Sequence, residues 1–247
     1  MHGIDKRPGC GGEECGDCAT VSFSRRRFLN TTLTGASAGV LAGIGTELGA
    51  PSPARAQTIT SPAEALQALV EGNQRYVERK LTFYQKDLAI LQQRTAEKQE
   101  PFASVLSCAD SRVPVELIFD QSIGHVFVNR VAGNIATTEI IASIEYGAAV
   151  LGTKLIMVLS HGNCGAVAAT IAGKAVPGQI SSLYRYIRPA VNQAGDNLRA
   201  ATEANARIQA QLLKESSPVL AGLIKEGKLS VVAAFYDVKN GKVTLLS

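Results

Sequence analysis

Apolar and polar positions along the chain follow a helical period in some stretches and a strand-like run in others. Leu66, Leu69, Val70 and Val77 recur at helical spacing after Ser61, a plausible N-cap, which predicts an amphipathic helix. Further helices are expected over Asp87–Lys98, Thr137–Val150 and Asn197–Lys214. Apolar runs of strand length occupy Phe102–Ser107, His125–Asn129, Lys154–Ser160, Leu229–Val238 and Val243–Leu246.

The order of these elements predicts the fold class. Strands that alternate with helices favour an α/β fold with an open, mostly parallel sheet and flanking helices. We expect a strand order beginning 2-1-3, so that the first and third strands are neighbours. Asn240-Gly241 is typical of a hairpin turn, which makes Val243–Leu246 an antiparallel strand at the C-terminal edge.

Length and composition suit one globular domain with a short N-terminal appendage, since the chain has 247 residues, 46% of them hydrophobic and 19% charged. Residues 1–56 carry the run Ser24-Arg25-Arg26-Arg27-Phe28-Leu29, a weakly apolar stretch, and Ala54-Arg55-Ala56 as a small-x-small cleavage site. This arrangement resembles a twin-arginine export signal, with a disordered basic tail as the alternative. We therefore expect residues 1–56 to be a leader handled by export machinery, residues 57–247 to be a single catalytic domain, and the mature protein to be periplasmic.

Charge and hydropathy limit the classes of partner. The formal net charge is only +4, and no basic stretch is interleaved with aromatic residues, so nucleic acid is not an expected partner. Glycines, threonines and Glu47 dilute the apolar stretch Leu33–Ala50, so no stable membrane span is expected. Cys10, Cys15 and Cys18 have a spacing that could bind metal, but they lack a nearby fourth ligand.

Three potential metal ligands stand where predicted strands end. Cys108 directly follows the first strand, His161 follows the third, and Cys164 comes three positions later at the start of a helix. Ligands of open parallel sheets bind at the carboxyl ends of strands, so these side chains should face one another. Two thiolates and an imidazole form a zinc set, and three protein ligands leave a position for water, as in catalytic zinc sites.

Two further residues follow Cys108 closely and suggest how such a site would work. Two thiolates cancel the formal charge of zinc, so neighbouring groups must help to activate water. Asp110 can accept a hydrogen bond from zinc-bound hydroxide, and Arg112 can hold the carboxylate ionised and away from the metal through a bidentate pair. Without Arg112, Asp110 could become a fourth ligand and close the site.

Other interpretations of the same residues remain open at this point. Two cysteines in an oxidising compartment could form a disulfide, and the metal could be purely structural. A disulfide would explain neither His161 nor the C-A-D-S-R run, and a structural zinc site lacks its fourth ligand.

The two motifs together resemble those of the β-carbonic anhydrases. The resemblance rests on Cys108-Ala109-Asp110-Ser111-Arg112 and His161-Gly162-Asn163-Cys164-Gly165, and it extends to Glu71–Tyr76, Arg130–Asn134 and Ile144–Tyr146. It implies one Zn²⁺ per subunit on Cys108, His161 and Cys164, with Asp110 and Arg112 as the catalytic dyad. It also implies substrate-binding roles for Gln99, Phe127, Tyr146 and Gly165, with Phe127 and Tyr146 lining an apolar pocket, often across a subunit boundary. Ordinary core packing is the alternative for those two aromatic residues.

The activity expected from this resemblance is reversible hydration of carbon dioxide to bicarbonate by zinc-bound hydroxide, a lyase reaction. Hydrolysis of carbonyl sulfide or carbon disulfide on the same site is one alternative, and a non-catalytic periplasmic zinc-binding module is another. The family's habit also predicts a homodimer or a dimer of dimers.

Overall fold

The computed structural model describes residues 59–83, 92–93 and 95–247, and these form an α/β structure. The predicted leader, residues 1–56, and its three cysteines lie outside the described residues, so the leader and the domain boundary stay predictions. The helix expected over Asp87–Lys98 lies partly outside them too, and residues 92, 93 and 95 are helical. Among the residues that are described, no helix is long and apolar enough to cross a membrane.

The strands form one five-stranded sheet of order β2-β1-β3-β4-β5, which confirms the predicted arrangement. Its members are β1 (Ala103–Ser107), β2 (Val126–Arg130), β3 (Leu155–His161), β4 (Ser230–Tyr236) and β5 (Val243–Leu246). The first four strands run parallel to one another, and β5 pairs antiparallel with β4 at the edge. All residues of β1 and β3 are buried, as expected of central strands covered on both faces.

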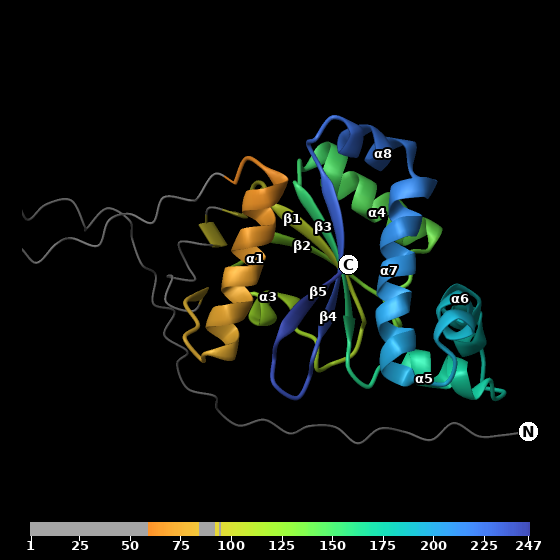
Figure 1. The fold of residues 1–247 in the computed structure, drawn as a ribbon. Helices are drawn as coiled ribbons and strands as arrows, with labels where there is room; N and C mark the ends of the chain where they lie inside the picture. The colour runs from red at the N-terminus through yellow and green to blue at the C-terminus, as the bar shows by residue number, and fades with distance from the viewer. Residues whose placement is uncertain (1–58, 84–91, 94) are drawn as a thin grey trace, which may run out of the picture. The chain divides into compact units, whose positions relative to one another are not determined.

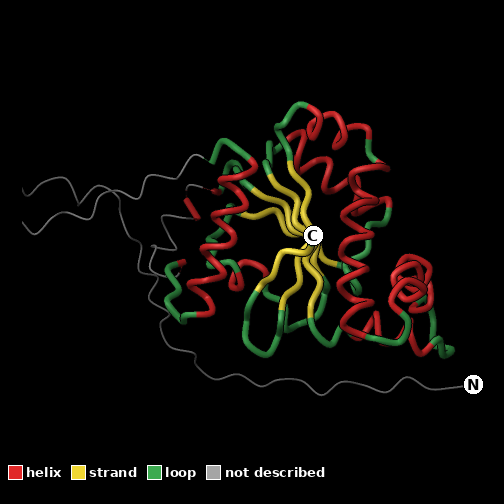
Figure 2. Tube along the Cα trace, in the orientation of Figure 1, coloured by secondary structure: helices red, strands yellow, loops and turns green. Residues whose placement is uncertain are grey.

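Helices cover both faces of this sheet (Figures 1 and 2). The described helices are α1 (Pro62–Val77), α3 (Val115–Ile118), α4 (Thr138–Glu145), α5 (Gly165–Ala172), α6 (Tyr184–Ala194), α7 (Leu198–Ser216) and α8 (Pro218–Lys225), with a π-helical turn, η2 (Tyr146–Val150), and a 3-10 turn, η3 (Ile180–Leu183). The helix expected over Thr137–Val150 is thus present, but its last turn widens to π geometry.

Successive side chains of the central strand β3 point to opposite faces of the sheet, and their contacts show which helices cover each face. Leu155, Met157 and Leu159 of β3 belong to a core cluster with residues of α1 and α3. Ile156 and Val158, which point the other way, belong to a second cluster with α4, α7 and α8. A third cluster gathers side chains of α5, α6 and α7 around the two cysteines beyond the strand ends. Each predicted metal ligand therefore stands at the junction of the sheet with these helices.

Local sequence signals explain where α1 begins. The Ser61 hydroxyl accepts a hydrogen bond from the Glu64 amide at 3.2 Å, and the Glu64 carboxylate accepts one from the Ser61 amide at 3.0 Å. This is a capping box, with Pro62 in the first turn where its missing N–H costs nothing. The predicted N-cap is confirmed.

A buried carboxylate ties the end of α1 to the segment that follows α3. The side chain of Asp120 is fully buried, and it accepts hydrogen bonds from the Arg75 guanidinium, the Thr82 amide and hydroxyl, and the Phe83 amide. Burial opposes ionisation of this carboxyl, but the hydrogen bonds from Arg75, Thr82 and Phe83 prevail and lower its pKa. The carboxylate therefore stabilises the fold in its charged form.

We expect Asp120→Asn to lower the free energy of unfolding by about 2–3 kcal/mol, because an amide cannot replace the charge-assisted bonds. Since the folded-state pKa is lowered, the contribution of Asp120 is present above its unfolded pKa of about 4 and is lost as pH falls below that value. Urea titrations at neutral pH and near pH 3 measure both effects. Glu226→Gln, in an exposed pair with Lys228, is the control and should change stability by less than about 0.5 kcal/mol. A pH-independent difference between wild type and Asp120→Asn would contradict this interpretation.

Candidate metal centre

The sheet brings the three predicted ligands together. Cys108 directly follows β1, and β1 pairs with β3 so that Ser107 lies level with Leu159, two residues before His161. Cys164 is the N-cap of α5, which begins immediately after the β3 turn. One ligand atom from each of Cys108, His161 and Cys164 lies within 4.8 Å of the other two, and all three residues are buried. Both cysteines are free thiols, so the disulfide alternative does not describe this structure.

The imidazole of His161 is oriented for coordination. Its Nδ1 lies 3.0 Å from the Gly162 carbonyl oxygen, an acceptor, which fixes the proton on Nδ1 and leaves a lone pair on Nε2. Nε2 is buried and has no hydrogen-bond partner among the described residues. A buried nitrogen lone pair without a partner is costly in an apolar site unless a metal or a donor fills it. The donor set, two sulfurs and one such nitrogen, therefore fits a zinc ion.

The pKa values of the Cys108 and Cys164 thiols move in opposite directions because the two groups are in contact. A hydrogen bond from the Cys164 thiol lowers the pKa of Cys108 to about 4, against the opposing effect of burial, with smaller help from the Gly133 amide. The same contact raises the pKa of Cys164, while the Val167 and Ala166 amides at the start of α5 partly offset the rise. The pair thus readily holds one thiolate, and a bound cation would favour loss of the second proton as well.

Asp110 and Arg112 form the bidentate pair that the sequence predicts. Arg112 Nε donates to Asp110 Oδ1 at 2.9 Å, and Nη2 donates to Oδ2 at 2.8 Å, while the Arg112 amide also donates to Oδ1. These hydrogen bonds, foremost the side-chain ones, hold the pKa of Asp110 well below its usual range. Asp110 Oδ2 lies 3.9 Å from His161 Nε2, but the carboxylate is not a member of the three-ligand cluster. The geometry therefore corresponds to an open site with Asp110 beside it.

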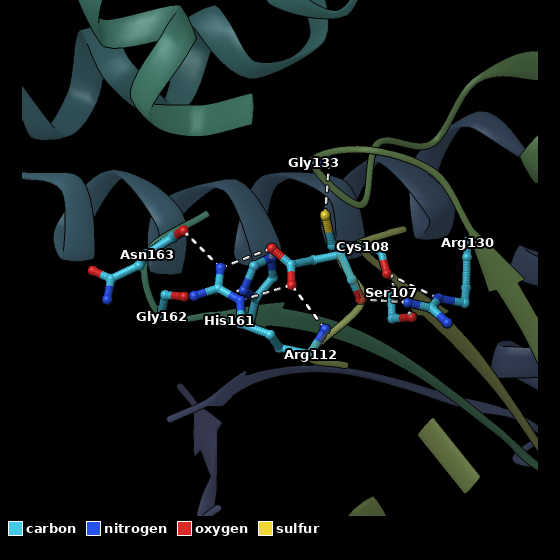
Figure 3. A network of polar contacts seen from close by, with 9 residues as sticks. Ser107, Cys108, Arg112, Arg130, Gly133, His161, Gly162 and Asn163 are labelled. Atoms are coloured by element: carbon cyan, nitrogen blue, oxygen red, sulfur yellow. Dashed lines mark hydrogen bonds and ion pairs between the residues drawn. The ribbon is translucent and has the colours of Figure 1, made fainter. Parts of the chain in front are cut away.

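Backbone contacts fix this dyad relative to the metal ligands (Figure 3). Arg112 Nη2 donates to the carbonyl of Asn163 at 3.1 Å, where Asn163 takes a left-handed conformation with φ of 55°. Arg130, at the end of β2, donates to the Cys108 carbonyl at 3.0 Å and to the Asp110 carbonyl. The sequence motif includes Arg130, but no role was predicted for it from the sequence. The available signal was an arginine at the carboxyl end of a strand, level with the end of β1 that precedes Cys108.

The predicted substrate-binding residues separate into two groups. Gly165 opens α5 directly after Cys164, and a Cβ added there would meet no atom within 4 Å, so the space in front of it is open. Phe127 pairs in register with Ser104 near the beginning of β1, and its ring packs against Tyr146 with centroids 6.2 Å apart. Gln99, which precedes β1, lines a surface hollow of about 490 Å³ together with Tyr146.

These last three residues lie toward the amino end of β1, whereas Cys108 follows its carboxyl end. The five residues of β1 span roughly 16 Å at the rise of a parallel strand. The structure therefore does not bring Gln99 and Tyr146 to the metal cluster of the same chain. Tyr146 is 47% exposed, which also argues against the core-packing alternative for its ring.

Comparison with known proteins agrees with this geometry. A family model described as carbonic anhydrase matches residues 103–243. "Carbonic anhydrase 2" of Mycobacterium tuberculosis is 34% identical over 196 residues, which cover 75% of this chain and 93% of that protein. The solved structure of a Coccomyxa β-carbonic anhydrase in complex with acetazolamide has a TM-score of 0.59 at 26% identity, covering 73% of this chain and 86% of that one. A tetrameric β-carbonic anhydrase from Sordaria macrospora shares the fold with a TM-score of 0.61 at 22% identity, covering 74% of this chain and 96% of that one.

Proposed function

Because this chain belongs to the β-carbonic anhydrase family, we infer that Cys108, His161 and Cys164 hold the zinc ion with which it interconverts carbon dioxide and bicarbonate. The enzyme is a carbonate dehydratase, a lyase. The observation that carries the zinc assignment is the convergence of two thiols and an unpartnered buried Nε2 within 4.8 Å of one another. A zinc ion held there would act as a Lewis acid that activates a water molecule for attack on carbon dioxide.

Asp110 orients the attacking water in this proposal. Its carboxylate stays ionised near neutral pH because Arg112 holds its pKa low, so Oδ2 is available as a hydrogen-bond acceptor and not as a store of protons. An acceptor fixed beside the ligand cluster would hold the O–H bond of the water, so that the O–H points away from the substrate and a lone pair of the water oxygen points toward the substrate. Arg112, tied also to the Asn163 carbonyl, keeps Asp110 from moving in as a fourth ligand.

Substrate would enter on the open side of the cluster. Gly165 lies at the amino end of α5 with free space in front of its Cα, and a side chain would narrow that space. Backbone amides at a helix N-terminus favour negative charge, which suits the bicarbonate product.

We expect metal analysis combined with stopped-flow hydration of carbon dioxide to find one zinc per chain and turnover that a chelator abolishes. The same preparation should be assayed with carbonyl sulfide and carbon disulfide. Turnover confined to the sulfur compounds would replace the assignment with a hydrolase, and bound zinc without any turnover would indicate a non-catalytic zinc-binding module.

A homodimer would complete the site. Gln99, Phe127 and Tyr146 lie at the far end of the sheet from their own Cys108, and β2, which carries Phe127, is an edge strand. We propose that these three residues line the carbon dioxide pocket of the partner subunit's metal centre, as a dimer or within a dimer of dimers. Exposure of Tyr146 in the single chain supports this arrangement, because its ring would be covered by the second copy.

Coexpression of two impaired variants tests the shared site. A Cys108→Ser chain lacks a metal ligand, and a Tyr146→Ala chain lacks a pocket wall that serves its partner. In a mixed dimer both defects fall on one site, so about half of its sites should regain normal turnover. Val219→Ala, at a residue with similar exposure of 44% on α8, is the control in place of Tyr146→Ala and should retain normal activity when expressed alone. Mixed dimers that form, as judged by native mass spectrometry, but recover nothing would refute the shared site.

Export is proposed on the sequence alone, since residues 1–56 lie outside the described residues. The support is Ser24-Arg25-Arg26-Arg27-Phe28-Leu29 followed by Ala54-Arg55-Ala56. Cell fractionation should find wild-type activity in the periplasm and the double variant Arg25→Lys, Arg26→Lys in the cytoplasm. An unchanged distribution would leave the segment as a basic tail.

A further inference from the structure

The loop after β2 donates a hydrogen bond to a metal ligand. The Gly133 amide donates to Cys108 Sγ, with a nitrogen-to-sulfur distance of 3.3 Å (Figure 3). A hydrogen bond to a thiolate withdraws electron density from the sulfur and fixes the direction of its lone pairs. The position of this loop therefore influences how strongly Cys108 would bind a metal.

The loop has a conformation that it would not hold unaided. Gly133 has φ of +79° and the next residue, Asn134, has φ of 43°, a left-handed conformation that is uncommon outside glycine. A Cβ on Gly133 would come within 2.7 Å of Ile187 Cδ1 of α6 and 3.3 Å of Ala166 Cβ of α5. The loop is thus pressed between two helices, and contacts from elsewhere must define where its amide points.

Two amide side chains of α7 supply those contacts. Asn205 Nδ2 donates to the Gly133 carbonyl at 2.8 Å, and Gln209 Oε1 accepts from the Ala136 amide at 2.9 Å. Gln209 Nε2 in turn donates to Asn205 Oδ1 at 3.3 Å and to the Tyr186 carbonyl at 3.1 Å. Asn205 is 0% exposed and Gln209 is 1% exposed. Each amide is held by the other, so the pair forms a rigid brace on both sides of the loop.

We propose that Asn205 and Gln209 are positioning residues that hold the Gly133 N–H on Cys108 Sγ and thereby tune the thiolate that binds zinc. The inference rests on the proposed function, because it concerns the metal site of that function. In the described part of the chain neither side chain forms a hydrogen bond to a ligand side chain; both act through the backbone of residues 133–136. Polar partners beyond the ligands commonly change metal affinity or activity by about 10- to 100-fold when they are removed.

A measurement on the wild-type chain tests the hydrogen bond itself. In protein reconstituted with ¹¹³Cd²⁺, a hydrogen bond from the Gly133 amide to a cadmium-bound Cys108 should transmit a scalar coupling between the amide proton and ¹¹³Cd. Absence of that coupling, in a protein whose cadmium is fully bound, would refute the proposal without any variant being made.

Substitutions then test the brace. Asn205→Leu removes the donor to the Gly133 carbonyl and keeps the branching of the side chain, and Gln209→Met removes the acceptor for the Ala136 amide and keeps the length of the side chain. In the Co²⁺-substituted protein, we expect the thiolate-to-cobalt charge-transfer band to move to lower energy, because an unassisted thiolate is a stronger electron donor. The dissociation constant for Zn²⁺ should nevertheless rise by about 10-fold or more, because the loop no longer holds Cys108 Sγ in its binding position and this loss outweighs the stronger donation.

The matched control is Thr202→Val. Thr202 is 1% exposed on the same helix, but within the part of the chain that the structure describes its hydroxyl donates only to the Leu198 carbonyl of α7 itself. This variant, like Asn205→Leu and Gln209→Met, removes a buried polar group from α7. It should leave both the cobalt band and the zinc affinity unchanged. Wild-type values in a folded Asn205→Leu or Gln209→Met chain would refute the brace, as would a Thr202→Val chain with the same shift. Failure of the wild-type chain to bind Zn²⁺ or Co²⁺ would instead refute the proposed function.

Discussion

Replacement of Cys108 by serine is expected to abolish zinc binding and to reduce carbon dioxide hydration on the order of 1,000-fold or more, because in the proposed function a bound zinc ion would supply the activated water. A serine hydroxyl has a far higher pKa than the Cys108 thiol, which the Cys164 contact lowers to about 4, and it does not offer an anionic soft donor near neutral pH. Zinc content by atomic emission and turnover by stopped-flow should fall together.

The control for this variant is Ser107→Ala, which alters the adjacent buried residue at the same strand end. Among the described residues, the Ser107 hydroxyl donates only one long hydrogen bond, 3.5 Å to the Cys108 carbonyl, so both zinc and turnover should be retained. A Cys108→Ser chain that is free of zinc and still hydrates carbon dioxide at the wild-type rate would overturn the assignment of the site.

The second large effect is expected at Asp110. Asp110→Asn should keep one zinc per chain but lose roughly 100- to 1,000-fold in kcat/KM, the magnitude typical of removing one preorganised polar group from a reacting centre. An asparagine also cannot hold the bidentate, charge-assisted pair with Arg112, so the orientation of the side chain is lost with the charge. Metal content and turnover should therefore separate in this variant, unlike in Cys108→Ser.

Asp196→Asn is the matched control, because Asp196 is an exposed carboxylate in the turn between α6 and α7. It removes the same charge from the chain and should leave kcat/KM within a factor of about 2. If Asp110→Asn retained turnover within threefold of wild type while binding zinc fully, Asp110 would have no part in orienting the nucleophile.

The hydrophobic pattern predicted most of the sheet, because the residues of each strand themselves carry the pattern that identifies it. The predicted strand Lys154–Ser160 contains an unbroken apolar run over residues 155–159, and the structure has β3 at Leu155–His161, shifted by one residue. The final antiparallel strand, Val243–Leu246, agrees residue for residue. The helices α3 and α8 were not predicted, because they have only 4 and 8 residues and are too short and too uniformly apolar to define a period.

Those residues of the candidate site that lie at strand ends could be predicted from the sequence. Cys108 and His161 each stand at the carboxyl end of a central parallel strand, and the strand order alone makes them meet. By contrast, Asn205 and Gln209 are two polar residues on a long helix, where they resemble solvent-facing positions. Their spacing of one helical turn within an alanine-rich stretch, Ala201–Ala210, was the only local sign that they share a buried face.

Sequence by itself thus determined the family and predicted which residues form the candidate ligand set and the Asp110–Arg112 pair, since these depend on short motifs whose spacing is fixed by the turns that carry them. Only the tertiary structure decided that Gln99 and Tyr146 lie at the opposite end of the sheet from Cys108, and that α7 braces the loop bearing Gly133. The physical reason is range: contacts between segments some seventy residues apart arise from packing of whole layers, and no periodicity in the chain encodes which polar group will face which backbone amide.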